Sequence, residues 1–484
     1  MAPITYYSTN NKNERVDFET ALLIGQPKDY GLFMMDRKDI PKLKLEEIEE
    51  MSEMSYADIA FRVLYPFLGS EIPASELKEL LEDAYAEDKI PTKIQHVVGG
   101  THIMWLTQGP TYSFKDYAAR FFGRALSYFL KKRSLRRTVI VATSGDTGGA
   151  VADALHNLKN IDNIVFFPKG SVSDGQRRQM TTLGGNVHAF EVNGDFDVCQ
   201  ALTKNLLGDK KFAEDVFGDN ERITSANSIS LGRLLPQIVF PFFAHSRIKK
   251  NNKSMLVSIP SGNFGDMMGT VIAKEMGLPV SKIICGVNEN TEFPDFLETG
   301  KYEVRPSKKS PSSAMVVSHP SNLARLIDFY GGHIYDQRDL DTKRITKPGV
   351  IDKMPNIEEM KKDIFSVGIK NKQHYLTIKK VFDDFGLILD PHGAVGWEAL
   401  KIYNKGNFNP LSVIYETADP GKFPEDVKRA IGVMPKIPKR MENQAKLPEK
   451  INSIKNSPDK TGQGLRLSDA QISEAKEKIK NLLS

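Results

Sequence analysis

Hydrophobic and polar positions along the chain follow two periods, and the change between them falls near residue 97. Before this point, apolar residues recur three and four positions apart, as on an amphipathic helix, at residues 18–23, 43–54 and 77–85. Ser75 stands where a helix cap is expected before the last of these segments. The pattern therefore predicts a separate, helical N-terminal lobe over residues 1–95.

From about residue 97, short apolar runs alternate with helical patterns. Strands are predicted at residues 138–141, 163–167, 187–192, 255–259, 283–287 and 413–415, and helices at 150–158, after 197, at 231–244 and up to 275. This alternation predicts the α/β class, with parallel strands covered by helices on both faces. Ligands of such sheets bind outside the carboxyl ends of the strands.

Two later segments depart from this alternation. Residues 335–375 are charged and carry prolines, so we predict an excursion from the sheet there. From residue 436 the chain is rich in lysine, proline and asparagine, which predicts an irregular tail. The tail closes with a short amphipathic helix after a capping box that begins at Ser468, and we expect this helix to pack on the body.

Composition excludes several classes of protein. The 484 residues are 40% hydrophobic and carry a net charge of +5, which is ordinary for a globular protein of two or three domains. Because the basic runs are short and no apolar run approaches the length of a membrane span, we expect neither a nucleic-acid nor a membrane partner. The nine histidines show no metal-ligand spacing, so no metal is expected.

The cellular compartment is indicated by the cysteines and by the start of the chain. Cys199 and Cys285 both lie in apolar contexts, which predicts buried free thiols in a reducing compartment. The first residues show no basic and apolar leader pattern, so secretion is not expected. We therefore predict a cytoplasmic protein.

A lysine at the start of a predicted helix is the first candidate for chemistry. The turn at residues 109–114 leads to Lys115, after which the helical pattern continues. A lysine is unfavourable at the positive end of a helix dipole unless its amine is neutral, buried or covalently bonded. A desolvated lysine of this kind is used in Schiff-base chemistry. The alternative is a surface lysine at a helix start.

Two glycine loops, at residues 143–149 and 260–266, each follow a predicted strand and precede a predicted helix. Such loops offer backbone N–H groups and a helix N-terminus to an anion. Neither has the GK[ST] ending of a P-loop or the GxGxxG pattern of a dinucleotide site. Together with Lys115 they favour a phosphorylated aldehyde cofactor such as pyridoxal phosphate, although each loop alone is equally consistent with a tight turn.

Two further segments carry polar groups in a suggestive order. Asn227, Ser228 and Arg233 offer amide, hydroxyl and guanidinium groups at one helix start, which suits a second anion. The alternative is a capped helix with Arg233 in a surface ion pair. Near the C-terminus, Thr417 follows a predicted strand and either presents its hydroxyl to a ring or caps the turn. His392 is expected to be a packed histidine.

As a set, these motifs resemble the threonine synthase family of fold type II pyridoxal-phosphate enzymes. GPTYSFKD (109–116), ATSGDTGGA (142–150), SANSISLGRLLPQ (225–237) and PSGNFGD (260–266) occur in the family's order and spacing. Residues 194–197 and 318–322 match as well. The resemblance implies two open twisted sheets, as in the tryptophan synthase β-like fold, with the cofactor in the cleft between them. The implied large domain comprises residues 96–124 and 236–436, the small domain 125–235, and the tail 437–484.

The resemblance also implies roles for individual residues. Lys115 would form the imine with the cofactor and move protons, Asp146 would lie beside the phenolic oxygen of the cofactor, and Thr417 would bond the ring nitrogen. The cofactor phosphate would be held by Gly262, Asn263, Phe264 and Gly265. The substrate carboxylate would be held by Thr143, Ser144 and Thr147, and the substrate phosphate by Asn227, Ser228 and Arg233.

The implied reaction is the last step of threonine biosynthesis, in which O-phosphohomoserine and water give threonine and phosphate. One alternative is a related phospholyase that releases 2-oxobutyrate, ammonia and phosphate from O-phosphohomoserine or O-phosphothreonine. Another is a catalytically lapsed, cofactor-binding regulatory protein. The chain is expected to act as a monomer or homodimer. It departs from the family pattern at Gln108, Ser230, Asp419 and Gly421.

Overall fold

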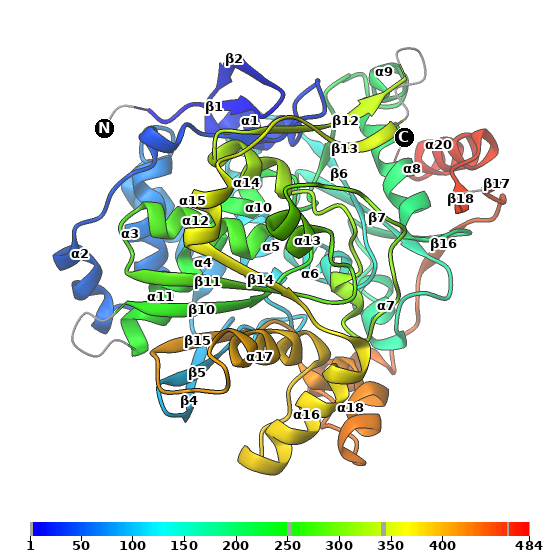
Figure 1. The fold of residues 1–484 in the computed structure, drawn as a ribbon. Helices are drawn as coiled ribbons and strands as arrows, with labels where there is room; N and C mark the ends of the chain where they lie inside the picture. The colour runs from blue at the N-terminus through cyan, green and yellow to red at the C-terminus, as the bar shows by residue number, and fades with distance from the viewer. Residues whose placement is uncertain (1–2, 249–253, 340–344, 462–463, 484) are drawn as a thin grey trace.

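The computed structural model describes residues 3–248, 254–339, 345–461 and 464–483, and it is built around two sheets (Figure 1). The larger sheet has the strand order β14-β11-β10-β15-β5-β4. Its strands are parallel except β4, which runs antiparallel to β5. The bounds are β4 (Lys93–Val98), β5 (Thr101–Trp105), β10 (Met255–Pro260), β11 (Val280–Val287), β14 (Ile364–Gly368) and β15 (Ser412–Glu416).

The smaller sheet has the order β16-β8-β7-β6-β9, and all of its strands are parallel. Its strands are β6 (Arg137–Ala142), β7 (Ile161–Pro168), β8 (Val187–Val192), β9 (Ile223–Ser225) and β16 (Ile451–Ile454). The α/β class and the two sheets predicted from the sequence are therefore confirmed, while the domain boundaries stay a prediction.

Helices cover both sheets; several bury one side only, whereas residues 265–273 and 391–400 of two helices are buried on all sides. Around the smaller sheet lie α6 (Asp146–Leu155), α7 (Asp174–Thr181), α8 (Phe196–Gly208) and α9 (Lys210–Phe217). The remaining helices between residues 115 and 431 are α5 (Lys115–Arg133), α10 (Leu231–Leu234), α11 (Val239–Ile248), α12 (Gly265–Glu275), α13 (Glu292–Thr299), α14 (Leu323–Phe329), α15 (Ile357–Asp363), α16 (Asn371–Phe385), α17 (Pro391–Tyr403) and α18 (Pro424–Ile431). In the described part of the chain, no helix is long and apolar enough to cross a bilayer.

The N-terminal segment contains predicted helices and also a small sheet that was not predicted, while its separation as a lobe stays a prediction. It begins with a small sheet of β1 (Tyr6–Ser8), β2 (Asn11–Val16) and β3 (Phe33–Met34). Its helices are α1 (Phe18–Ile24), α2 (Leu45–Glu49), α3 (Tyr56–Leu68) and α4 (Ala74–Tyr85). Ser75 lies inside α4, whose cap position is Pro73. Tyr6 and Tyr7 are buried in the same apolar cluster as α5 and α12, so the segment shares the main core.

The helix predicted at residues 231–244 is interrupted. The chain instead forms α10, a 3₁₀ turn over Leu235–Ile238, and then α11. Pro236 explains the break, because it lacks the backbone N–H that a continuous helix needs at this position. The break matters for the site, since it fixes the short helix that carries Arg233.

The segment at residues 335–375 contains regular structure that its charge and prolines concealed. β12 (His333–Arg338) and β13 (Ile345–Lys353) pair as an antiparallel ribbon. The strand β14 then joins the edge of the larger sheet, parallel to β11. The expected excursion is therefore correct for the ribbon and wrong for β14.

The tail is more ordered than its composition indicates. It contains α19 (Lys439–Gln444), β16, the pair β17 (Asp459–Thr461) and β18 (Gly464–Arg466), and α20 (Asp469–Leu483). The predicted capping box is present, since Ser468 Oγ accepts from Gln471 N–H at 3.2 Å and Gln471 Oε1 accepts from Ser468 N–H at 3.3 Å. The helix α20 packs against α8 (Figure 1), as predicted for a helix docked on the body.

The packing of α20 predicts that alanine substitutions at two positions of this helix lower the stability of the protein by different amounts. Ile479 is fully buried beside the smaller sheet, whereas Leu482 is 37% exposed. Ile479→Ala should lower the free energy of unfolding by about 2–5 kcal/mol, because it leaves a cavity. Leu482→Ala should change it by less than about 0.5 kcal/mol. Urea unfolding followed by circular dichroism measures both, and equal losses would contradict the docked helix.

Candidate active site

One cavity of about 440 Å³ lies at the carboxyl ends of strands from both sheets. The chain leaves β6 into Thr143, β10 into the 261–265 loop and β15 into Thr417, as expected for a site at parallel strand ends. Every site residue predicted from the sequence lines this cavity: Lys115, Thr143, Ser144, Asp146, Thr147, Asn227, Ser228, Arg233, Gly262, Asn263, Phe264, Gly265 and Thr417. Their individual roles stay predictions.

Lys115 is the first residue of α5, and its side chain is only 15% exposed. Its Nζ lies 3.7 Å from Oδ2 of Asp146, the first residue of α6. Burial lowers the pKa of the Lys115 amine, and the Asp146 carboxylate partly opposes this effect. The surface-lysine alternative is therefore wrong, because the amine is enclosed and points at a carboxylate.

A second lysine, which the sequence analysis did not assign, completes this arrangement. Lys422 Nζ lies 2.6 Å from Asp146 Oδ1 and donates to the Thr111 carbonyl at 2.8 Å. The side chains of Lys422 and Asp146 are 0% and 2% exposed. Gln176 donates to the same Asp146 oxygen at 2.9 Å. The only sequence signal for Lys422 was its place five residues after Thr417 in the family-like segment 416–423.

The ionisation of Asp146 follows from these neighbours. Burial alone raises the pKa of a carboxyl group, but the charges of Lys422 and Lys115 outweigh it and hold the pKa of Asp146 well below its ordinary value. Asp146 is therefore a carboxylate at neutral pH, and it accepts hydrogen bonds without donating any.

The loop at residues 262–265 has the form of an anion cradle. Phe264 adopts a left-handed conformation with φ of 62° and is the cap residue of α12, so the loop turns sharply onto the helix N-terminus. A Cβ on Gly262 would lie 3.0 Å from the Ala314 carbonyl, which leaves no room for a side chain there. Because the loop precedes the positive end of α12, its backbone amides suit a phosphate group.

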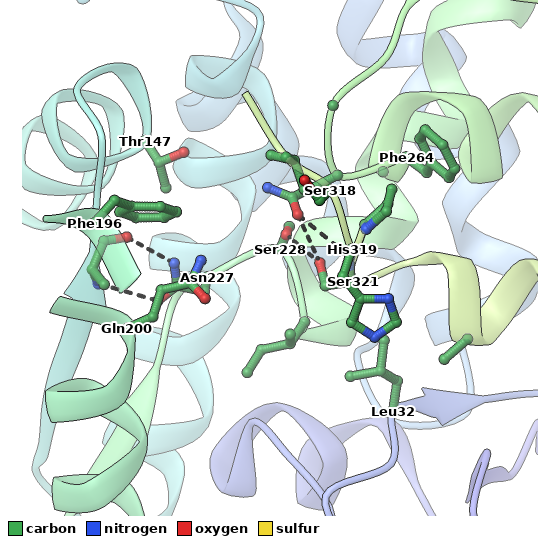
Figure 2. Close-up of a pocket in the computed structure, with 18 of the residues that line it drawn as sticks. Leu32, Thr147, Phe196, Gln200, Asn227, Ser228, Phe264, Ser318, His319 and Ser321 are labelled. Atoms are coloured by element: carbon green, nitrogen blue, oxygen red, sulfur yellow. Dashed lines mark hydrogen bonds between the residues drawn. The ribbon is translucent and has the colours of Figure 1, made fainter. Parts of the chain in front are cut away.

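Asn263 and Ser228 both contact the segment that contains residues 318–322, and Figure 2 shows Ser321 of this segment beside Ser228. Ser321 donates to Asn263 Oδ1 from both its backbone N–H and its hydroxyl, each at 3.3 Å. Ser228 Oγ lies 3.1 Å from Ser321 Oγ. The motif at 318–322, which the sequence matched without a role, therefore links the two predicted phosphate-binding segments.

The amide of Asn227 is already engaged. It donates to the Ala142 carbonyl at 2.9 Å and accepts from the Ala142 N–H at 3.3 Å, so it clamps its turn to the end of β6. The turn is also held from behind by Arg325, which is fully buried. Arg325 donates to the Ile229 carbonyl at 2.6 Å and to the Phe33 carbonyl at 2.9 Å. Because both ends of its amide are bonded to Ala142, Asn227 positions the turn and offers no free amide group to a ligand.

Arg233 is a buried cation with an unused donor. Its Nη1 donates to the Ala226 carbonyl at 2.7 Å, whereas its Nε is buried with no hydrogen-bond partner in the described chain. Burial lowers the pKa of Arg233 to about 10. The surface ion pair considered from the sequence is therefore wrong. A buried guanidinium without a carboxylate partner is costly unless an anion binds it.

The three remaining threonines predicted for the site differ in the hydrogen bonds that they already form within the protein. Thr143 Oγ1 accepts from the N–H groups of Gly145 at 2.9 Å and Gly148 at 2.8 Å, so it shapes the loop. Thr147 lies on the same wall of the cleft as Phe196 (Figure 2). Thr417 lines the cavity, and its carbonyl accepts from Phe114 N–H at 2.9 Å.

The departures from the family pattern lie outside this cavity. Asp419 caps the short turn at Pro420–Lys422 by accepting from Gly421 N–H at 2.8 Å. A Cβ on Gly421 would lie 2.6 Å from the Lys436 carbonyl, which explains a glycine there. Gln108 is exposed, and Ser230 is buried at the start of α10.

His392 is buried, as predicted for a packed histidine. Its Nδ1 bonds Asp390 Oδ1, and its Nε2 accepts from the Ala314 N–H at 3.1 Å, so both ring nitrogens are occupied. The two cysteines, Cys199 and Cys285, are free and buried, as expected.

The residues present fit pyridoxal phosphate. They offer a desolvated amine at Lys115, a glycine loop at a helix N-terminus in which a side chain at Gly262 would crowd the Ala314 carbonyl, and a hydroxyl at Thr417. The unpaired Nε of Arg233 remains for a second anion beyond the cofactor phosphate.

The charges around Lys115 predict how its amine titrates in the apoprotein. Asp146→Asn removes the carboxylate that raises the pKa of Lys115, so the pKa should fall further below its ordinary value of 10.5. Lys115 should then react faster with acetic anhydride at pH 8, as followed by mass spectrometry of its peptide. The exposed Lys210 serves as the internal control. A rate that is unchanged or lower in the variant would show that Asp146 does not act on the amine.

Comparisons with known proteins agree with this site. Three family models match successive parts of the chain: Threonine synthase N terminus at residues 5–85, Pyridoxal-phosphate dependent enzyme at residues 105–348, and Threonine synthase, C-terminal, at residues 393–463. The chain is 34% identical to a threonine synthase of Pseudomonas aeruginosa over 459 residues, which cover 93% of this chain and 96% of the relative. For a threonine synthase of Escherichia coli, the identity is 32% over 443 residues, with 91% and 94% covered.

Solved structures show the same relationship. A pyridoxal-phosphate-bound threonine synthase from Brucella melitensis matches with a TM-score of 0.85 and 29% identity, covering 99% of each chain. A threonine synthase from yeast matches with a TM-score of 0.84 and 28% identity, covering 99% of this chain and 98% of that one. With its cofactor-compatible cavity, the chain therefore belongs to the threonine synthase family of pyridoxal-phosphate-dependent lyases.

Proposed function

We propose that the protein converts O-phosphohomoserine and water into threonine and phosphate. The observation that carries this proposal is the largely buried amine of Lys115, which shares one cavity with two separate sets of groups suited to anions. One set is the loop Gly262–Gly265 at the start of α12. The other includes Arg233, which has no carboxylate partner among the described residues and whose Nε forms no hydrogen bond. A substrate that carries its own phosphate needs this second set.

The first set of residues holds the cofactor. Bound pyridoxal phosphate supplies a ring that stabilises negative charge on the carbons of the substrate amino acid. Lys115 would hold the cofactor covalently, and Asp146 would accept from its phenolic group. Gly262, Asn263, Phe264 and Gly265 would hold its phosphate. Thr417 would offer its hydroxyl to the ring nitrogen, which needs no proton to accept this bond.

The second set of residues holds the substrate. Ser144 and Thr147 offer hydroxyls at the start of α6 to the substrate carboxylate, and Thr143 shapes the loop that carries them. Ser228 and Arg233 bind the substrate phosphate, on a turn that Asn227 fixes to β6.

Proton transfers are assigned to Lys115. Once the amino group of the substrate has taken its place on the cofactor, the freed amine of Lys115 removes a proton from the α-carbon and then one from the β-carbon. Phosphate leaves from the γ-carbon, where Arg233 stabilises the negative charge on the leaving group. Lys115 returns one proton to the γ-carbon, the hydroxyl of water adds at the β-carbon while the other water proton goes to the phosphate, and Lys115 returns the second proton to the α-carbon. Because burial keeps the pKa of Lys115 below its ordinary value, the neutral amine needed for these steps is available nearer neutral pH.

The setting of the enzyme follows from its chemistry. We infer a cytoplasmic enzyme that acts as a monomer or homodimer on a small-molecule substrate. Support comes from the two buried free thiols, Cys199 and Cys285, which suit a reducing compartment.

Product analysis tests the proposed reaction directly. The purified protein, loaded with pyridoxal phosphate and incubated with O-phosphohomoserine, should release threonine and phosphate in equal amounts, as measured by liquid chromatography with mass spectrometry. Lys115→Ala should lower kcat by about a thousandfold or more, because it removes the anchor and the base. The exposed-site variant Lys210→Met should keep the wild-type rate.

The alternatives give different products in the same assay. Release of 2-oxobutyrate and ammonia would replace the proposal by a phospholyase. Cofactor binding without turnover would make the protein a regulatory homologue.

A further inference from the structure

The cavity is lined by five lysine or arginine side chains, which differ in whether a carboxylate pairs with them. Lys115 lies 3.7 Å from Asp146, Arg305 lies 2.7 Å from Asp295, and Arg338 lies 3.9 Å from Asp336. Arg233 and Lys204 form no ion pair with any described residue. These two are therefore the lining cations that remain available to an anionic ligand.

Lys204 lies on α8, one turn after Gln200 and two turns after Phe196, which also line the cavity. The side chain of Lys204 is half-buried, and its amine forms no hydrogen bond with another described residue. Burial lowers the pKa of Lys204, and the charges of Asp336 and Asp197 oppose this effect without an ion-pair contact. A partly desolvated lysine on a cavity wall gains from an anionic ligand, so its position points to one.

The acidic group whose charge acts most strongly on Lys204 already has other partners. Asp336 on β12 lies 3.1 Å from His319 Nε2 and accepts from the Gly349 N–H at 3.0 Å. Burial raises the pKa of Asp336, but the hydrogen bond with His319 outweighs it and the pKa falls to about 2. Figure 2 shows His319 on the wall opposite Phe196 and Gln200. Asp336 therefore has its partners in His319 and Gly349, and it forms no ion pair with the Lys204 amine.

The charge of the proposed substrate calls for a second cation in the cavity, in addition to Arg233. A phosphate monoester carries between one and two negative charges at neutral pH, since its second pKa is near 6. Lys115 is committed to the cofactor, and the loop Gly262–Gly265 to the cofactor phosphate. Arg233 alone brings one positive charge to the substrate phosphate. A second cation in the same cavity would complete the neutralisation of the dianion.

Building on the proposed function, we propose that Lys204 binds the phosphate group of the substrate together with Arg233. Lys204 reaches the phosphate from α8, beside the smaller sheet, and Arg233 reaches it from α10. The ligand class is a phosphate monoester dianion or the inorganic phosphate released from it. A substrate that bridges the two helices would also hold the two walls of the cavity together.

The competing explanation is a latch between the two walls of the cleft. In that case Lys204 attracts Asp336 when the walls approach and never touches the ligand. The two explanations differ in what happens when Asp336 is neutralised. A ligand-binding Lys204 gains from the loss of a competing carboxylate, whereas a latch is broken by Asp336→Asn as much as by Lys204→Met.

Inorganic phosphate serves as the probe. Its dissociation constant is measured on the holoenzyme by isothermal titration calorimetry, and the KM for O-phosphohomoserine is measured in parallel. Lys204→Met should raise both constants by about 10- to 100-fold, as expected for one charge-assisted hydrogen bond. Arg233→Ala should raise both in the same range. Lys204→Arg should restore most of the phosphate affinity, and Lys210→Met on α9 should match the wild type.

Each result decides between the explanations. Unchanged phosphate affinity in Lys204→Met, with an unaltered circular dichroism spectrum, would overturn the proposal. Weakening in Asp336→Asn equal to that in Lys204→Met would also overturn it, in favour of the latch. If Lys204→Met does not fold, Lys204→Gln replaces it, with the same criteria. Lys204-dependent phosphate binding without threonine formation would refute the proposed reaction and leave the phosphate site standing.

Discussion

The buried carboxylate of Asp146, held between the amines of Lys115 and Lys422, is the interaction on which the site depends. Asp146 opens α6 beside the smaller sheet, and Lys422 follows β15 of the larger sheet, so their contact joins the two sheets at the cavity. Removing one partner of such a pair leaves an uncompensated charge in the interior, which costs about 3–5 kcal/mol. Lys422 therefore allows Asp146 to stay ionised, and an ionised Asp146 offsets part of the burial penalty on the Lys115 amine.

The rest of the cavity is arranged around this fixed charge. The turn that carries Ser228 is held by three distant parts of the chain: β6 through Asn227, the 318–322 segment through Ser321, and the N-terminal sheet through Arg325. The core is shared as well, because the N-terminal segment packs into the same apolar cluster as α5 and α12. The donor groups that we propose for two phosphates are thus held from several parts of the chain, and such preorganisation lowers the entropy lost when ligands bind.

Local signals predicted the α/β class, the glycine loops at helix starts and the lysine turn, whereas the second sheet and the proposed contacts to the cofactor came from the resemblance to a family. The sequence did not predict Lys422 or the engagement of Asn227 with Ala142, since both depend on segments that are far apart in the chain. Nor did charge and proline content reveal that residues 364–368 join a buried sheet, because hydrogen bonding to β11 overrides that composition. Asp419, which differs from the family pattern, acts locally as a turn cap.

The identity of the anchoring lysine is the central claim, and it can be measured chemically because Lys115 and Lys422 flank the same carboxylate. Borohydride reduction of the holoenzyme fixes the cofactor to the amine that bonds it, and peptide mapping by mass spectrometry then locates the adduct. The account predicts a pyridoxyl-phosphate adduct on Lys115, with Lys422 unmodified. An adduct on Lys422, or a full-yield adduct in Lys115→Ala, would contradict it.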